Sequence, residues 1–203
     1  MMKRYIAIAA GSLIGWSMVT AEEPGRTDRE AEAKRLYESG TSLYRAGRFA
    51  DAIDATRRAL ELNRRLYPVD RFPDGHLQVS ACLNNLGLFL GESGSLDQAL
   101  PLLEQSLAMK RKLYPRAHAE VAVTISNLGR FRDAMGAIDE ALRLYEEALA
   151  MRRELYPPAK YPDGHVELAN GLFNMGFAWL RLSQWDKAQP YLDQALAMRL
   201  KLY

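Results

Sequence analysis

The tripeptide Leu66-Tyr67-Pro68 decides the fold, because it returns at regular intervals along the chain. It recurs as Leu113-Tyr114-Pro115 and as Leu155-Tyr156-Pro157, and the last two residues are Leu202-Tyr203. The four tyrosines are 47, 42 and 47 residues apart. A repeat of this length indicates a protein built from stacked, similar structural units.

Small residues keep the same interval, so that one glycine and one alanine fall at fixed positions in each of four units. In each unit apolar residues also recur every three or four positions, which is typical of helices with one buried face. We expect the small residues to let the two helices of a unit approach closely. They are Gly40, Gly87, Gly129 and Gly176, followed by Ala52, Ala99, Ala141 and Ala188.

The second unit shows where one helix ends and the next begins. Its first apolar stripe runs from Val79 to Leu90, and Gly94 interrupts the pattern. Ser95 and Gln98 have the spacing of a capping box, which predicts the start of a second helix. Neither helix can bury its apolar face alone, so neighbouring units must stack on one another.

The composition is that of a globular protein, with 48% hydrophobic and 26% charged residues among 203. Without residues 1–21 the chain carries 25 basic and 25 acidic side chains, because Lys3 and Arg4 are the only charged residues in that segment. A neutral body gives no electrostatic reason to expect nucleic acid or a membrane as a partner of the mature form. Cys82 is the only cysteine, which excludes an intrachain disulfide.

Residues 1–21 have the layout of a secretory signal peptide. Lys3-Arg4 is followed by an apolar run over 5–19, and Val19-Thr20-Ala21 supplies the small residues of a cleavage site. The alternative is an uncleaved membrane anchor, but fifteen helical residues span only about 22 Å of a hydrocarbon core of about 30 Å. We therefore expect export, to the periplasm or the medium, after cleavage near Ala21.

The repeat resembles the tetratricopeptide pattern, and its length and asparagines are similar to those of the kinesin-light-chain subtype. The resemblance implies an all-α, right-handed solenoid of four helix-turn-helix units without a cofactor. The units would cover about 31–67, 77–114, 119–156 and 166–203, after a short linker at 22–30. The motifs that carry it are Leu83-Asn84-Asn85-Leu86-Gly87, Asn127-Leu128-Gly129 and Asn174-Met175-Gly176, each with the small residues that follow.

Three histidines are the first candidates for a chemical site. His76, His118 and His165 occupy one repeat position, immediately before the first helix of their units. Metal binding is one interpretation, but a periodic residue is better explained as a structural part of the repeat. Cys82 falls on the apolar side of a helix and is expected in the core. We therefore expect no catalytic residue and no metal ligand, and the chain is predicted not to be an enzyme.

The resemblance implies a concave groove lined by the first helix of each unit, with Asn85, Asn127 and Asn174 facing into it. An amide can donate and accept hydrogen bonds at once, which suits the backbone of an extended peptide. Aromatic and arginine side chains often anchor bound proteins. The alternative for this surface is an ordinary solvated helix face. The other candidates for the groove are Asn84, Tyr37, Tyr44, Arg45, Arg130, Phe173, Phe177 and Arg181.

These features predict a protein- or peptide-binding scaffold or adaptor. The alternative is an architectural array, because the final helix carries Leu192, Leu196 and Leu200 with no further helix to cover them. Such a chain would be a piece of a longer repeat protein or would associate with itself through its C-terminal end. Bacterial proteins with similar repeats and a Tyr-Pro-Asp-Gly-His turn often carry a caspase-like protease domain beside them.

Overall fold

The computed structural model describes residues 25–203, which form eight α-helices and no strand. Residues 1–24 lie outside the described part, and with them the predicted signal peptide and its cleavage site at Ala21. None of the described helices combines the length and the apolar character that a membrane crossing requires. The helices are α1 (Arg26–Arg45), α2 (Phe49–Leu66), α3 (Leu77–Glu92), α4 (Leu96–Leu113), α5 (Ala119–Ala134), α6 (Ile138–Leu155), α7 (Val166–Arg181) and α8 (Trp185–Leu202).

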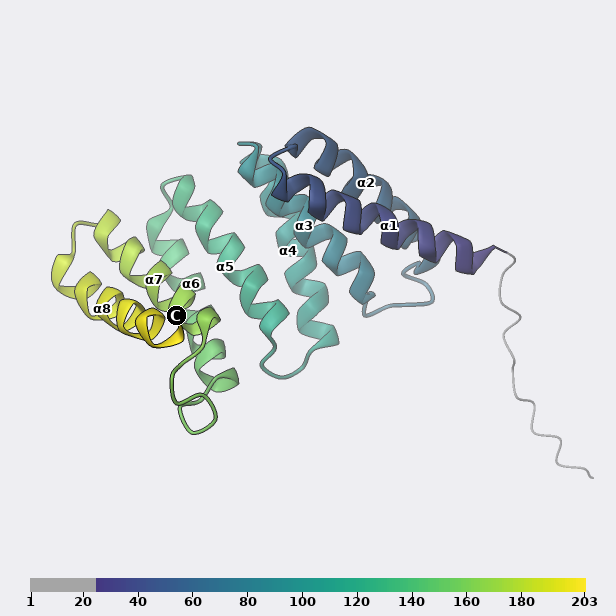
Figure 1. The fold of residues 1–203 in the computed structure, drawn as a ribbon. Helices are drawn as coiled ribbons and strands as arrows, with labels where there is room; N and C mark the ends of the chain where they lie inside the picture. Colours follow the sequence, from purple (N-terminus) through teal and green to yellow (C-terminus); the bar gives the residue numbers. More distant parts are fainter. Residues whose placement is uncertain (1–24) are drawn as a thin grey trace, which may run out of the picture.

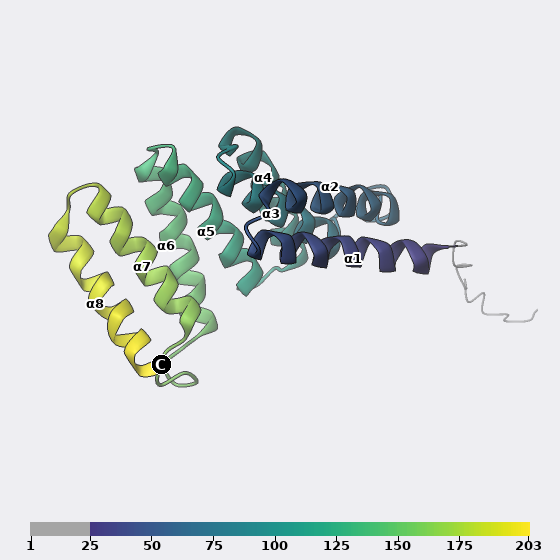
Figure 2. The ribbon, with the colours of Figure 1, turned by 45° about the horizontal axis from the view of Figure 1, so that its top comes forward.

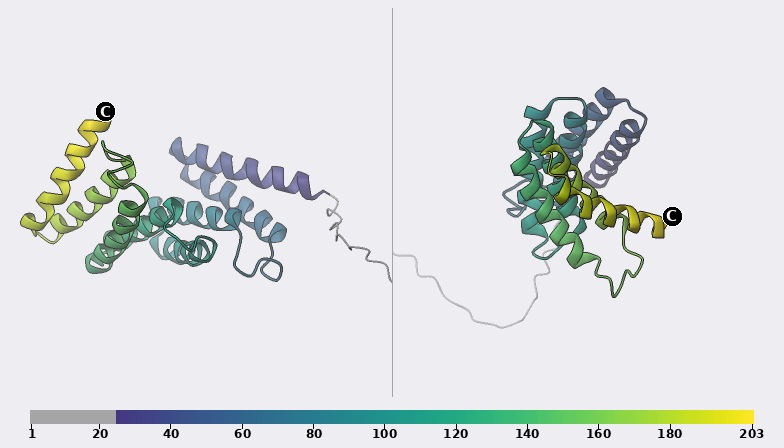
Figure 3. Two further views of the ribbon diagram at one scale, coloured as in Figure 1. Left: turned by 90° about the horizontal axis from the view of Figure 1, so that it is seen from below. Right: turned by 90° about the vertical axis from the view of Figure 1, so that its left-hand side faces the viewer.

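The helices are arranged as four pairs that follow one another in chain order (Figure 1). Each pair packs on the next, and α1 and α8 lie at opposite ends of the array (Figure 3). Buried apolar side chains continue from the first pair through the last. The predicted all-α solenoid of helical repeats is therefore confirmed.

The two helices of each pair meet at the small residues that mark the repeat. Ala52, Ala99, Ala141 and Ala188 are each fully buried at the crossing. A β-carbon built on Gly129 would lie 2.7 Å from Cε1 of Tyr145, closer than real β-carbons come to other atoms. The equivalent atoms on Gly87 and Gly176 would lie 2.8 and 2.7 Å from Leu103 and Leu192. The expected role of these glycines is confirmed.

The helix ends differ from the sequence prediction in two places. The first helix begins at Arg26, inside the segment expected to be a linker, and an ion pair of 2.9 Å joins Arg26 to Glu30 in its first turn. The helix after Gly94 begins at Leu96, but the side chain of Ser95 makes no capping hydrogen bond. The predicted capping box was therefore wrong, because the backbone at Ser95, with φ −87° and ψ 58°, is not extended as a capping residue requires.

The repeated tyrosines and histidines form the connections between units. Each tyrosine ring stacks on the histidine that follows it, with ring centroids 3.4 Å apart for Tyr67 and His76. Nδ1 of His118 and of His165 accepts a hydrogen bond of 3.2 Å from the backbone N–H two residues later, which caps the following helix. The histidines therefore have the structural role that their periodicity predicts.

His76 differs from the other two histidines, because its buried Nδ1 has no hydrogen-bond partner among residues 25–203. Burial lowers the pKa of His76, and the positive charge of Arg26 lowers it further. Both effects favour the neutral ring that stacks on Tyr67.

Among residues 25–203 no three histidine, cysteine or acidic side chains come together in a way that could hold a metal ion.

Replacing Gly129 with leucine tests the close contact within a unit. We expect Gly129→Leu to lower the free energy of unfolding by about 1–3 kcal/mol or more, because its side chain must displace the ring of Tyr145. Thermal and urea unfolding measure the loss. Ala134→Leu adds a similar side chain at an exposed position of the same helix and should change stability little. Equal stability of the two variants would contradict this packing.

Candidate binding face

The first helices of the four units, α1, α3, α5 and α7, lie side by side along one side of the array (Figure 2). We call the solvent-accessible surface of these four helices the first-helix face. Among the residues predicted to line a groove, Arg45, Arg130, Phe173, Phe177 and Arg181 are exposed on this face. Tyr37, Tyr44, Asn85, Asn127 and Asn174 are half-buried.

The three asparagines at the repeat position have different surroundings. Asn85 donates a hydrogen bond of 3.4 Å to Oγ1 of Thr41 on α1, and so joins two units. Asn127 and Asn174 make no side-chain hydrogen bond to any described residue, and both remain partly accessible. The amides available to a ligand are therefore those on α5 and α7.

Asn84 does not belong to the open surface. Its side chain is only 7% exposed, and its Oδ1 accepts a hydrogen bond of 3.0 Å from the hydroxyl of Thr124 on the next unit. Its Nδ2 donates to Oδ1 of Asn85 at 3.3 Å. The sequence analysis predicted both Asn84 and Asn85 as groove residues. In the structure Asn84 is buried between α3 and α5, where a ligand cannot reach it.

Two of the three arginines on the face, Arg130 and Arg181, form ion pairs with the preceding unit. Arg130 on α5 pairs with Glu92 at the end of α3, and its guanidinium lies 4.8 Å from the ring of Phe131. Arg181 on α7 pairs with the buried Asp133 on α5 at 3.3 Å. These pairs fix the ends of neighbouring first helices and leave the outer edges of both guanidinium groups accessible.

The aromatic candidates divide into packed and exposed groups. Tyr44 stacks on Phe89 at 4.5 Å and is part of the contact between α1 and α3. Phe173 and Phe177 lie one turn apart on α7, with parallel rings 6.1 Å apart, and are 44% and 45% exposed. They form the apolar part of the first-helix face near its C-terminal end.

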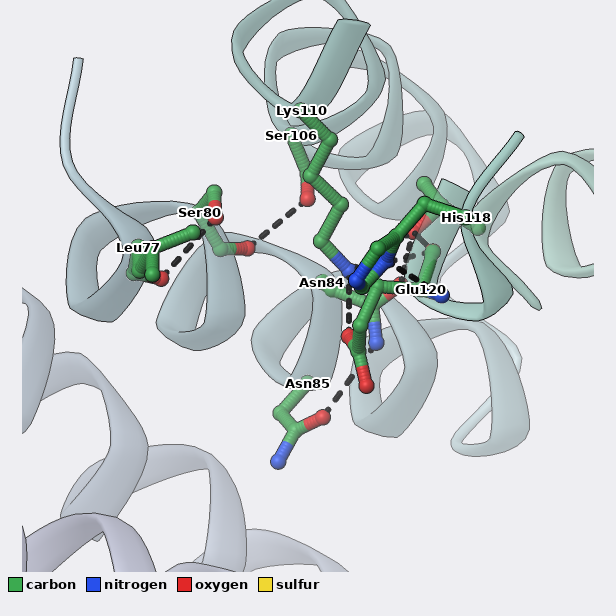
Figure 4. Close-up of polar contacts among 9 residues, drawn as sticks. Leu77, Ser80, Asn84, Asn85, Ser106, Lys110, His118 and Glu120 are labelled. Carbon is green, nitrogen blue, oxygen red and sulfur yellow. Dashed lines mark hydrogen bonds and ion pairs between the residues drawn. The ribbon is translucent and has the colours of Figure 1, made fainter. Parts of the chain in front are cut away.

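The junctions beneath the face contain buried charged residues that the sequence analysis missed. Lys110 comes from α4, four residues before Tyr114, and is 2% exposed. Its ammonium donates to the Glu120 carboxylate at 2.8 Å and to the Thr124 hydroxyl at 3.0 Å. Figure 4 shows Lys110 directed at Glu120, so that one side chain joins units two and three.

Arg152 fills the equivalent position in the next junction, four residues before Tyr156. It is 4% exposed, donates to Ser126 Oγ at 2.7 Å and pairs with Glu167 at 3.3 Å. Burial lowers the pKa of Arg152, and the Glu167 carboxylate opposes that effect. The one sign of this network in the sequence is that a basic residue precedes the repeated tyrosine by four positions in two units.

Comparison with known proteins supports the repeat assignment. Residues 78–154 match the family model of the tetratricopeptide repeat. The sequence matches no curated protein. The structure is similar to BtubC (BKLC) from P. vanneervenii, with a TM-score of 0.73 and 21% identity over 86% of this chain. The chain spans 66% of that protein's length.

Two further solved structures have the same fold. A putative kinesin light chain from Podosopora anserina, with nearly identical TPR-like repeats, gives a TM-score of 0.70 at 19% identity, over 90% of this chain and 79% of that one. A Rap protein complexed with competence and sporulation factor gives 0.68 at 16% identity, over 89% of this chain and 45% of that one. At such identities the likeness shows the fold alone. Together with the family match over the two central units, it shows that the described part of the chain has the fold of a tetratricopeptide-type helical repeat array.

Proposed function

We propose that this chain is the interaction scaffold of an exported bacterial protein, and that it binds a protein or an extended peptide on the first-helix face. The observation that carries the proposal is the pair of unengaged amides, Asn127 and Asn174, on neighbouring helices. The repeat fold itself supports protein or peptide binding. One structure with the same fold is described as a Rap protein in complex with competence and sporulation factor.

The face offers three kinds of contact to a peptide. The Asn127 and Asn174 amides can each donate to a backbone carbonyl and accept from a backbone N–H. Phe173 and Phe177 offer an apolar surface, and burying such rings stabilises a complex. Arg181 keeps accessible N–H groups beside them, although it already pairs with Asp133. A partner with an extended apolar segment fits this arrangement.

Replacing the free amides tests the binding face. A partner would first be captured by cross-linking from the exported fraction and then produced separately for titration. We expect Asn127→Ala and Asn174→Ala each to weaken binding several-fold, because each removes hydrogen bonds made only with the ligand. The melting temperature should stay close to that of the wild type. Gln98→Ala, which removes an exposed amide on α4, is the matched control.

The outcome separates binding from folding roles. If the asparagine variants unfold at lower temperature and bind normally per folded molecule, the two amides are structural and the proposed face is wrong.

Export is part of the proposal and rests on the charged start, apolar run and Val19-Thr20-Ala21 of the sequence. We expect N-terminal sequencing of the mature protein to begin at Glu22, because signal peptidases cut after small residues of this kind. The protein should be recovered from the periplasm or the medium. A cytoplasmic product that retains Met1 would contradict export and leave the binding face untouched.

Self-association is a second candidate function, and the exposure of α8 favours it. Leu196 is 59% exposed, whereas the leucines at the same repeat position, Leu60, Leu107 and Leu149, are at most 6% exposed because the next unit covers them. Leu200 and Tyr203 lie exposed on the same helix end. A second copy that packed on this surface would bury the apolar side chains that the following unit buries elsewhere.

Light scattering over a hundredfold concentration range tests self-association. We expect the average mass to rise with concentration, and Leu196→Asp to reduce that rise because it places a charge in the apolar contact. Val69→Asp changes an apolar residue in a loop that is 76% exposed, and it should have no effect. A strictly monomeric wild-type chain would exclude this function and leave binding on the first-helix face as the only proposal.

A further inference from the structure

The first junction lacks the buried cation that joins the later units. Asn63 occupies the repeat position of Lys110 and Arg152, four residues before its tyrosine. Gln78 occupies the position of Glu120 and Glu167, two residues after its histidine. A neutral pair thus replaces an ion pair, and the shorter Asn63 side chain leaves space between the units.

That space is a pocket of about 630 Å³ between α1, α2 and α3. Its walls are largely apolar and include Ala33, Leu77, Ala81 and the buried Cys82. Burial raises the pKa of the Cys82 thiol to about 11, so that it remains a neutral wall atom. The volume is within the range of about 300–1,000 Å³ that is usual for ligand pockets.

The polar groups that line this pocket include both donors and acceptors. Asn63 is 4% exposed, and its Nδ2 donates to the carbonyl of Ala59 at 2.9 Å and to Sγ of Cys82 at 3.5 Å. No donor among the described residues reaches its Oδ1. Two carboxylates, Glu30 and Glu38, also line the pocket.

The two carboxylates of the pocket differ in how closely a cation of the chain holds them. Glu30 is held by Arg26 at 2.9 Å and by the hydroxyl of Tyr67 at 3.4 Å. Glu38 is more open, because Lys34 is the cation near it and lies 3.9 Å away, at the limit of an ion pair. Since Arg26 already pairs with Glu30, Glu38 is the carboxylate at this pocket with the more distant cation partner.

We propose that this pocket binds a basic side chain, lysine or arginine, of the protein or peptide that the scaffold carries. The inference rests on the proposed function and adds a specific subsite to it. The chain itself shows the fit, because Lys110 and Arg152 fill the equivalent spaces of the next two junctions with their own side chains. The aliphatic stem of the guest packs on the apolar walls, and its charged end reaches Asn63 Oδ1 and the carboxylates.

Three short peptides test the subsite directly on the full chain. Gly-Arg-Gly, its citrulline analogue and Gly-Phe-Gly would be titrated while the backbone amide shifts of Ala33, Ala81 and Cys82 are followed by NMR. We expect saturable shifts with the arginine peptide and about tenfold weaker binding of citrulline, which keeps the shape and lacks the charge. Equal or tighter binding of the phenylalanine peptide, or no shift up to about 10 mM arginine peptide, would overturn the proposal.

Variants whose own side chains fill the pocket provide a second test of the subsite. The double variant Asn63→Lys/Gln78→Glu installs the pair found in the other junctions and should abolish the shifts while keeping or raising the melting temperature. Ala81→Leu fills the same space without charge and should also abolish them, which keeps the test valid if the double variant does not fold. Shifts that persist in a folded, filled variant would place the peptide elsewhere and overturn the subsite.

Titrating the natural partner against both sets of variants distinguishes the subsite from the wider binding face. If Asn127→Ala weakens the partner and filling the pocket does not, the subsite is wrong and the first-helix face stands. If filling the pocket weakens the partner and Asn127→Ala has no effect, the subsite stands and the wider face is wrong.

Discussion

The close approach of two helices at a glycine and an alanine is the contact on which the array depends. It recurs in all four units, and at Gly87, Gly129 and Gly176 the side chain opposite fills the space that a β-carbon would need. Helices held this close can bury long apolar stripes with few large side chains. Each pair then presents a flat, reproducible surface to the next, which is what allows four units to stack in one direction.

Between units the contact is of another kind, because buried polar groups accompany the apolar ones. Desolvating Lys110 and Arg152 is costly, and each is tolerated because it has a carboxylate partner across the junction and also donates to a hydroxyl group. Such directional bonds favour one alignment of neighbouring units over a sliding apolar contact. The first junction lacks this buried ion pair and contains the pocket between α1, α2 and α3 instead.

The fold could be predicted from the sequence because its determinants are periodic. The glycines, the alanines and the tyrosine–histidine spacing all recur in one phase, and the structure gives each of them a packing role. Asn84 could not be assigned in this way, because its burial depends on Thr124 of a different unit. Lys110 and Arg152 were overlooked for the same reason: in a single helix a basic residue resembles a solvated one, and only stacking buries it. The pocket follows from Asn63 and Gln78 only when the four units are compared position by position.

The stacked tyrosine and histidine rings have a consequence for how such arrays change over time. Nine residues separate Tyr67 from His76 and Tyr156 from His165, but only four separate Tyr114 from His118. The ring centroids nevertheless stay 3.4 to 3.7 Å apart, with the planes within 9° of parallel. The same ring contact is therefore made across loops of two lengths. The length of these loops can differ while this contact between neighbouring units is kept.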